Sequence, residues 1–237
     1  MNFLSLFSGI GGIDLGLERA GMRCVGQVEI DPFCRRVLAK HWPNVWRYDD
    51  VRTLTGDVIR EYCGPVEILC AGFPCQPVSQ NGKKQAQDDA RWLWPETCRL
   101  IREVRPGWVL LENVPGLLDR GMGDVLGDLA ACGHDAEWDC VPAAVFGAEH
   151  LRDRVFILAY VAGAGPQGEE PAGRVWGRGL LTQRDRRTSA PRVLRGGHGF
   201  SDRVDRVKSL GNAVYPDVAE WIGRRILAAA AERQVAT

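Results

Sequence analysis

The sequence predicts an α/β fold in which helices cover both faces of a mainly parallel sheet. Two observations predict it. Short apolar runs alternate with longer amphipathic stretches, and glycine, cysteine and acidic residues gather just past the apolar runs, where an open parallel sheet binds its ligands. Helical crossovers favour parallel pairing because each helix carries the chain back to the same edge of the sheet. With 237 residues, 45% hydrophobic and 25% charged, the chain has the size of one globular domain with at most a small appendage.

Five apolar runs are expected to form buried strands, at residues 2–7, 23–29, 66–71, 108–114 and 154–161. Four stretches between them have the apolar spacing of crossover helices, at residues 13–20, 32–41, 93–104 and 122–132. A last helix is expected at residues 216–232, with one apolar stripe formed by Val218, Ile222, Ile226 and Ala229. This stripe predicts that the last helix docks back on the sheet.

The sequence shows neither a membrane segment nor a secretory signal. No apolar run reaches the roughly 18 residues of a spanning helix, and the first residues, MNFLSLFSGIGG, lack a basic region and a cleavage site. We therefore expect a cytoplasmic protein without membrane contact. The 8 cysteines include no Cys-x-x-Cys pair, so we expect reduced thiols and no metal site.

One segment of the chain is basic, although the formal net charge of the whole chain is zero. Residues 166–208 carry 10 Lys and Arg against 5 Asp and Glu, whereas residues 1–165 carry 17 against 22. The segment is rich in glycine and proline, and Trp176 and His198 lie among its arginines. Such a segment is either a solvated, partly flexible insertion or a nucleic-acid contact surface. Composition alone leaves both readings open.

A glycine-rich turn, FSGIGG at residues 7–12, follows the first expected strand. Glycine permits a positive φ and lets a ligand approach the backbone, and the helix that starts there offers free N–H groups to an anion. Glu29, at the end of the second strand, has the spacing at which an acidic side chain meets ribose hydroxyls in nucleotide folds. Because the pattern is Gly-x-Gly-Gly, it favours an adenosine ligand other than NAD. A tight connection and a solvated carboxylate are the alternatives.

Two aspartates, Asp49 and Asp50, follow a third short apolar stretch. A carboxylate in this place fits hydrogen bonding to an adenine amino group. The alternative role for these aspartates is to stabilise a turn or to cap a helix.

The loop GFPCQPVSQ at residues 72–80 places Cys75 beyond a buried strand, between Pro74 and Pro77. Cys70 lies inside that strand and is expected to be a small buried hydrophobe. A loop thiol is a good nucleophile toward soft, electron-poor carbon, because even a small thiolate fraction is very reactive. An incidental thiol is the alternative.

Glu112 and an arginine pair complete the candidate residues. Glu112 closes an apolar strand, where desolvation can raise the pKa of a carboxyl until it holds a proton near neutral pH. Arg152 and Arg154 enter the last expected strand and project to the same face, where they can grip a phosphate or polarise a carbonyl. The alternatives are a helix-capping carboxylate and two surface arginines.

In their joint order, these segments resemble the cytosine-5 DNA methyltransferase family. The resemblance covers residues 3–161 and 204–227, about three quarters of the chain. Its elements are FxGxGG at residues 7–12, PCQ at 74–76, ENV at 112–114, RxR at 152–154 and GNAV at 211–214. Each element is modest alone, but the order of all five is specific. The Asp/Asn/Ser-Pro-Pro-Tyr loop of amino-group methyltransferases does not occur in the sequence.

The resemblance implies a Rossmann-like, S-adenosylmethionine-dependent methyltransferase sheet and the activity of a DNA (cytosine-5-)-methyltransferase. It implies that S-adenosylmethionine is the methyl donor and is held by Phe7, Gly9, Gly11, Gly12, Glu29, Asp50 and Asn212. It further implies that Cys75 attacks C6 of a cytosine flipped out of duplex DNA, while Glu112 protonates or hydrogen-bonds N3. Arg152 and Arg154 would hold the base or the catalytic loop.

The resemblance also divides the chain into three parts. Residues 1–161 form the catalytic and cofactor-binding domain, residues 162–203 a short target recognition region, and residues 204–237 a C-terminal segment that returns to the catalytic domain. The basic segment falls largely in the recognition region, which favours DNA contact. Three features depart from the family: the recognition region is short, His150 stands where Gln is usual, and Ser5 stands where Asp is common.

The expected partners are double-stranded DNA and a cognate restriction endonuclease, and a monomer is expected because no heptad pattern is present. A tRNA cytosine-5 methyltransferase on the same scaffold is the second enzymatic reading. A DNA-binding relic with weak activity and a nucleotide-dependent oxidoreductase are the others. The presence of Cys75, Glu112 and the arginine pair argues against a relic.

Overall fold

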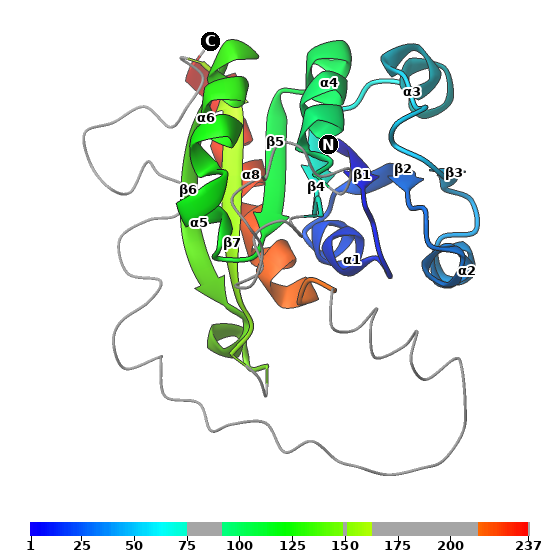
Figure 1. Cartoon of the computed structure of the whole chain (residues 1–237), viewed down its shortest axis with the longest axis horizontal. Coiled ribbons are helices and arrows are strands. Elements are labelled where there is room, and N and C mark those ends of the chain that lie inside the picture. Colours follow the sequence, from blue (N-terminus) through cyan, green and yellow to red (C-terminus); the bar gives the residue numbers. More distant parts are fainter. Residues whose placement is uncertain (75–91, 149–150, 163–212, 237) are drawn as a thin grey trace.

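A single sheet organises the chain. The structure is a computed structural model that describes residues 1–74, 92–148, 151–162 and 213–236 (Figure 1). These residues form a 7-stranded sheet in the order β3-β2-β1-β4-β5-β7-β6. Its strands are β1 (Asn2–Leu6), β2 (Arg23–Val28), β3 (Trp46–Tyr48), β4 (Ile68–Ala71), β5 (Trp108–Asn113), β6 (His134–Pro142) and β7 (Asp153–Val161).

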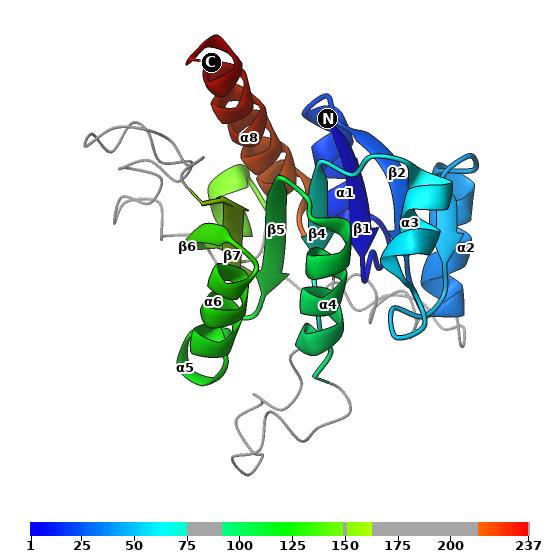
Figure 2. The same cartoon turned by 90° about the horizontal axis from the view of Figure 1, so that it is seen from above.

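Helices cover both faces of this sheet, as Figure 2 shows. Four of the helices lie on one face, and their bounds are α3 (Gly56–Cys63), α4 (Trp94–Val104), α5 (Leu117–Arg120) and α6 (Met122–Ala131). On the other face α1 (Gly12–Arg19) packs against α8 (Pro216–Ala236). The remaining elements are α2 (Pro32–His41) and a short 3-10 helix, η2 (Ala143–Phe146).

The alternation of side chains along each strand creates two separate hydrophobic cores. In β5, Val109 and Leu111 join the core under α4 and α6, whereas Trp108 and Leu110 join the core under α1 and α8. This pattern arises because successive side chains of a strand point to opposite faces. Such double burial explains why the central strands are continuous apolar runs in the sequence.

The predicted α/β fold with a mainly parallel sheet is confirmed. All five expected strands and all five expected helices are present, with ends that differ by a few residues. The last helix docks on the sheet as predicted, since Val218, Ile222 and Ile226 are buried in its core. Five elements were not predicted from the sequence, namely α3, α5, η2, β3 and β6. The signal for β6 was present, because acidic and apolar residues alternate strictly from Asp135 to Cys140.

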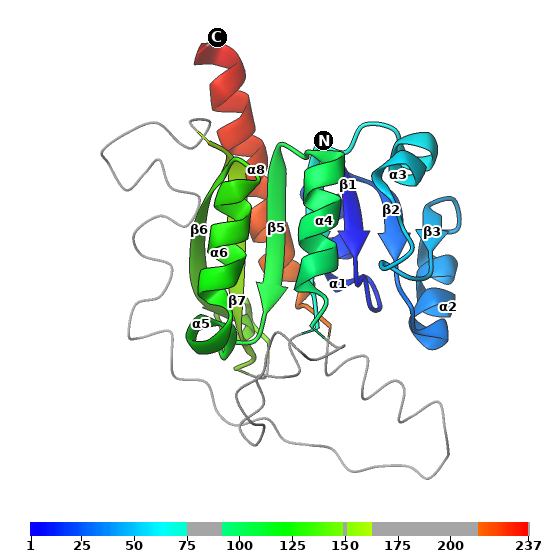
Figure 3. The same ribbon diagram turned by 45° about the horizontal axis from the view of Figure 1, so that its top comes forward.

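One strand runs against the others, and this reversal positions the site. Neighbouring strands pair in parallel except at β7, which is antiparallel to both β5 and β6. Figure 3 shows the arrowheads of β1, β2 and β5 pointing to one edge of the sheet. Because β7 is reversed, its first residues lie at the edge where its parallel neighbours end.

The recognition region expected at residues 162–203 lies outside the described residues except for Ala162. The division of the chain at residues 161 and 203 therefore stays a prediction. Within the part of the chain that is described, no helix combines the length and apolar character needed to cross a bilayer.

Candidate active site

The sheet edge described above brings together most of the residues expected to form a site. The glycine turn follows β1, Glu29 follows β2, Asp50 follows β3 closely, and Glu112 lies near the end of β5. Arg154 lies at the start of the reversed strand β7, and Arg152 directly precedes that strand. Ligands of open α/β sheets bind outside this edge.

Three of the expected cofactor-binding residues have an unusual backbone conformation. Phe7, Gly9 and Gly11 adopt positive φ angles of 55°, 57° and 86°. Such a conformation costs a non-glycine residue like Phe7 free energy and is concentrated at ligand sites. At Gly9, a Cβ would meet no atom of the described residues within 4 Å. The backbone there is open to a ligand, which fits the close approach expected for a cofactor.

Glu29 fixes the glycine turn to the end of β2. Its Oε2 accepts a hydrogen bond from the backbone N–H of Gly9 at 2.7 Å, and its Oε1 accepts one from Asp31 N–H at 2.8 Å. A carboxylate has roughly four acceptor positions, so both oxygens retain capacity for ribose hydroxyls. Ile30 next to it is 58% exposed and offers an apolar surface beside Glu29. Ile30 was not among the residues predicted for the site, although it directly follows Glu29 in the sequence.

The segment after Asn212 docks directly on the glycine turn. A Cβ at Gly12 would lie 2.3 Å from the carbonyl oxygen of Val214, so only glycine allows this approach. A cavity of about 480 Å³ beside the contact is lined in part by the glycine turn, Arg152 and residues 213–216. Three segments that lie far apart in the sequence therefore meet at one place.

Gly12→Ala is expected to destabilise the protein. The added Cβ would force the Val214 backbone away from α1, and overpacking of this kind costs on the order of 1–3 kcal/mol. Chemical denaturation measures the loss. Gly127→Ala on α6 is the matched control, since a Cβ there meets nothing within 4 Å among the described residues. Equal stability of Gly12→Ala and the wild type would contradict the docking of this segment.

A buried carboxylate lies beneath the glycine turn. Asp14 in α1 is fully buried and accepts hydrogen bonds from Ser5 Oγ at 3.0 Å and Gln27 Nε2 at 2.9 Å. Burial raises the pKa of Asp14 to about 6, against the effect of these two hydrogen bonds. Ser5 therefore lies next to a carboxylate that α1 supplies.

Glu112 has the environment expected of an acid. Its side chain is only 9% exposed, and its Oε1 forms an ion pair with Arg154 Nε at 2.9 Å. Its Oε2 lies 3.1 Å from the position of a Cβ on Gly72, the residue that follows β4. Burial raises the pKa of Glu112 to about 7, although the charges of Arg154 and Arg152 lower it. A group with this pKa can hold or release a proton at neutral pH.

The arginine pair lies beside this acid. Burial and the charge of Arg154 lower the pKa of Arg152, while Glu112 raises it. Arg152 also has a positive φ of 38°, just before β7 begins. The sequence placed both arginines at the entrance to this strand. In the structure Arg154 contacts Glu112, and the charge of Arg152 acts on the pKa of Glu112.

Asn113 connects the end of β5 to the loop that leads to Cys75. Its Nδ2 donates a hydrogen bond to the carbonyl oxygen of Phe73 at 3.0 Å. Its Oδ1 accepts one from Val114 N–H at 2.8 Å, so both the nitrogen and the oxygen of this buried amide are hydrogen-bonded. This arrangement holds the two neighbouring strand ends at a fixed separation.

Some expected site residues lie outside the described residues. These are Cys75, Asn212 and His150. The proximity of Cys75 to Glu112 therefore stays a prediction, which the position of Gly72 beside Glu112 supports. Cys70 is fully buried in β4, as predicted. No group of His, Cys, Asp and Glu within the described ranges could hold a metal ion.

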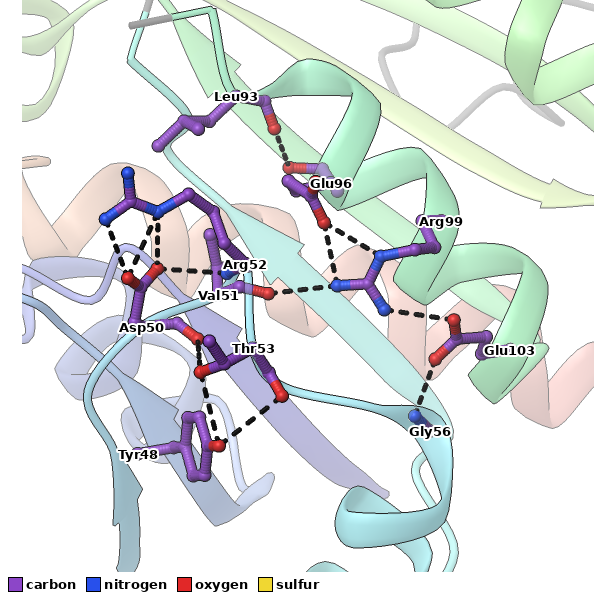
Figure 4. Close-up of polar contacts among 11 residues, drawn as sticks. Tyr48, Asp50, Val51, Arg52, Thr53, Gly56, Leu93, Glu96, Arg99 and Glu103 are labelled. Carbon is purple, nitrogen blue, oxygen red and sulfur yellow. Dashed lines mark hydrogen bonds and ion pairs between the residues drawn. The ribbon is translucent and has the colours of Figure 1, made fainter. Parts of the chain in front are cut away.

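Asp50 has a partner that the sequence analysis did not identify. The side chain of Arg52 forms a bidentate ion pair with the Asp50 carboxylate (Figure 4). The Asp-x-Arg spacing was the available signal, but a spacing of two residues in a turn does not fix side-chain directions.

Known proteins share this architecture and sequence. The family described as C-5 cytosine-specific DNA methylase matches residues 1–173. The type II methyltransferase M.NgoMIV of Neisseria gonorrhoeae is 38% identical over 162 residues, and M2.BsuMI of Bacillus subtilis is 38% identical over 168 residues. These alignments cover 66% and 67% of this chain but 50% and 42% of the relatives. The chain thus spans half or less of the length of these two proteins.

A solved structure supports the same relationship at the level of the fold. The Dnmt2 methyltransferase of S. pombe superimposes with a TM-score of 0.61 over 77% of this chain and 57% of that protein, at 21% sequence identity. At this identity the likeness concerns the fold alone. The family match, in contrast, spans most of the chain and includes the glycine turn, Glu29, Glu112 and the arginine pair. The chain therefore belongs to the C-5 cytosine-specific DNA methylase family.

Proposed function

We propose that this chain methylates C5 of cytosine in double-stranded DNA, with S-adenosylmethionine as the methyl donor. The observation that carries the proposal is the buried carboxyl of Glu112, whose pKa is raised to about 7 and which lies at the sheet edge where the loop to Cys75 begins. Family membership and the names of the type II relatives support the choice of DNA as the substrate.

The residues at the glycine turn fit the proposed cofactor. The open backbone at Gly9 admits a ligand, Glu29 has free acceptor positions for ribose hydroxyls, and Asp50 can accept from the adenine amino group. When bound, S-adenosylmethionine supplies an electrophilic methyl group on a sulfonium. We propose that Phe7, Gly11, Gly12 and Asn212 complete this site.

The residues of the chain would make C5 reactive in the following way. C5 of cytosine is a poor nucleophile inside an aromatic ring. Addition of the Cys75 thiolate to C6, with proton donation from Glu112 to N3, converts the ring to an enamine whose C5 can take a methyl group. Loss of the C5 proton to a base, departure of the thiolate and return of the N3 proton to Glu112 then restore the aromatic ring.

Two arginines support this chemistry. Arg154 pairs with Glu112 and keeps the carboxyl oriented, and Arg152 adds positive charge beside it. Because C6 is stacked inside a duplex, the target cytosine must leave the stack before Cys75 can reach it. We propose that residues 162–203 read the target sequence, since this segment carries 8 Arg against 4 Asp and Glu, whereas the whole chain has no net charge.

Transfer of a labelled methyl group tests the proposal. The purified full chain is incubated with methyl-labelled S-adenosylmethionine and either duplex DNA or tRNA. We expect label in DNA and none in tRNA. Label in tRNA alone would support the second enzymatic reading, and binding of NAD without S-adenosylmethionine would support the oxidoreductase. A monomeric state and a cognate restriction endonuclease are further proposals, which gel filtration and the neighbouring genes would test.

A further inference from the structure

Arg52 donates hydrogen bonds to both carboxylate oxygens of Asp50 (Figure 4). Oδ1 accepts hydrogen bonds from the backbone N–H of Arg52 at 3.0 Å and from its Nε at 2.9 Å. Oδ2 accepts from Nη2 at 2.7 Å and from the same Nε at 3.1 Å. The Asp50 side chain is 27% exposed, so it remains accessible at the sheet edge.

These hydrogen bonds orient the Asp50 carboxylate. Three N–H groups of Arg52 supply them, and Nε is shared between the two oxygens, at 2.9 Å from Oδ1 and 3.1 Å from Oδ2. Because the shared Nε lies nearer to Oδ1, Oδ2 keeps the greater capacity for a further hydrogen bond. Asp50 therefore presents an oriented acceptor instead of a freely rotating carboxylate.

The backbone of the same turn is held independently from α4. The carbonyl oxygen of Val51 accepts a hydrogen bond from Arg99 Nη2 at 3.0 Å, and Glu103 Oε2 accepts one from Gly56 N–H at 2.6 Å. Arg99 Nη1 also donates to Glu103 Oε1 at 2.9 Å, so both connections form one network. Loss of the Arg52 side chain would thus remove the Nε and Nη2 donors from the Asp50 carboxylate, which keeps only the backbone N–H of residue 52, without releasing the turn.

We propose that Arg52 is a positioning residue that makes the cofactor site selective for a 6-amino purine over a 6-oxo purine. The inference rests on the proposed function, in which Asp50 binds the amino group of adenine. An oriented carboxylate accepts an N–H from a 6-amino group and repels the oxygen of a 6-oxo group. The hydrogen bonds from Arg52 also lower the pKa of Asp50, which keeps its carboxylate an acceptor only.

Binding of two matched ligands tests this role. Calorimetry on the full chain compares S-adenosylhomocysteine with S-inosylhomocysteine, which carries oxygen in place of the amino group. In Arg52→Ala we expect the preference for the adenosine compound to fall by about tenfold, through the loss of one oriented hydrogen bond to a charged group. The affinity for S-inosylhomocysteine should stay the same or rise. Collapse of the turn would instead weaken both ligands equally and would contradict the proposal.

Two further variants sharpen the test. Arg52→Lys keeps the positive charge but not the planar fork, so it should be as unselective as Arg52→Ala. Arg224→Ala removes an exposed Arg–Glu pair on α8 at 2.6 Å and should keep the wild-type preference. Wild-type selectivity in Arg52→Ala or in Arg52→Lys would overturn the role of Arg52. A wild-type chain that does not bind S-adenosylhomocysteine would overturn the proposed function itself.

Discussion

Cys75→Ala is expected to form no covalent complex with duplex DNA that contains 5-fluorocytosine, whereas the wild-type chain should form a complex that survives denaturation. The C5 fluorine cannot leave as a proton, so the bond between Cys75 Sγ and C6 persists after methyl transfer. Denaturing electrophoresis in the presence of S-adenosylmethionine measures the complex. Methyl transfer to ordinary DNA should disappear with it, because no other group supplies the attack on C6.

Cys132→Ala is the control for this experiment. Cys132 is half-buried at the end of α6, and β6, which starts two residues later, runs parallel to β5 and ends at the site. It therefore lies at the opposite edge of the sheet, and its removal should leave the complex intact. A complex that forms with Cys75→Ala would refute the assignment of the nucleophile.

Glu112→Gln is expected to lower the rate of methyl transfer by roughly 10²–10⁴-fold, the range usual for the loss of a general acid. Glutamine keeps the shape of the side chain but cannot donate a proton to N3 and carries no charge for Arg154. Binding of S-adenosylmethionine should be unchanged, because the ion-pair partner of Glu112 is Arg154 and not a residue of the glycine turn. Single-turnover kinetics and calorimetry measure the two quantities separately.

The pH dependence follows from the pKa of the same group. Because burial raises the pKa of Glu112 to about 7, its proton-donating form is lost as the pH rises through that value. In the wild type, kcat/KM should therefore have a falling limb near pH 7 that the residual activity of Glu112→Gln lacks. Glu61→Gln, an exposed carboxylate on α3, should keep the wild-type profile. Full turnover by Glu112→Gln would rule out the role of an acid.

The central strands of the sheet could be predicted from the sequence because they are buried on both faces. Runs such as residues 68–71 and 108–111 are apolar throughout and fully buried, which is the pattern of a strand covered on both faces. The edge strand β6 lacks such a run and was missed, and so was the helix α3, although Thr55 caps its first turn. The direction of β7 also depends on β6, since the two strands form an antiparallel pair across a short connection.

The candidate site was predictable as a set of residues but not as a set of contacts. The glycine turn and Glu29 are near in sequence, and their spacing indicated a common site. The ion pair between Glu112 and Arg154 depends on the register of β5 against β7, in which Glu112 lies opposite Phe156. A single sequence does not reveal such a register. The bidentate ion pair between Arg52 and Asp50 likewise depends on side-chain directions within a turn.

The nucleosides in DNA from cells that express the chain test the central claim most directly. Mass spectrometry of the digested DNA should detect 5-methyl-2′-deoxycytidine in cells with the wild-type chain and none in cells with Cys75→Ala, in a host that lacks its own cytosine methylation. Methylation on an exocyclic amino group of cytosine or adenine, or no methylated nucleoside at all, would contradict the account.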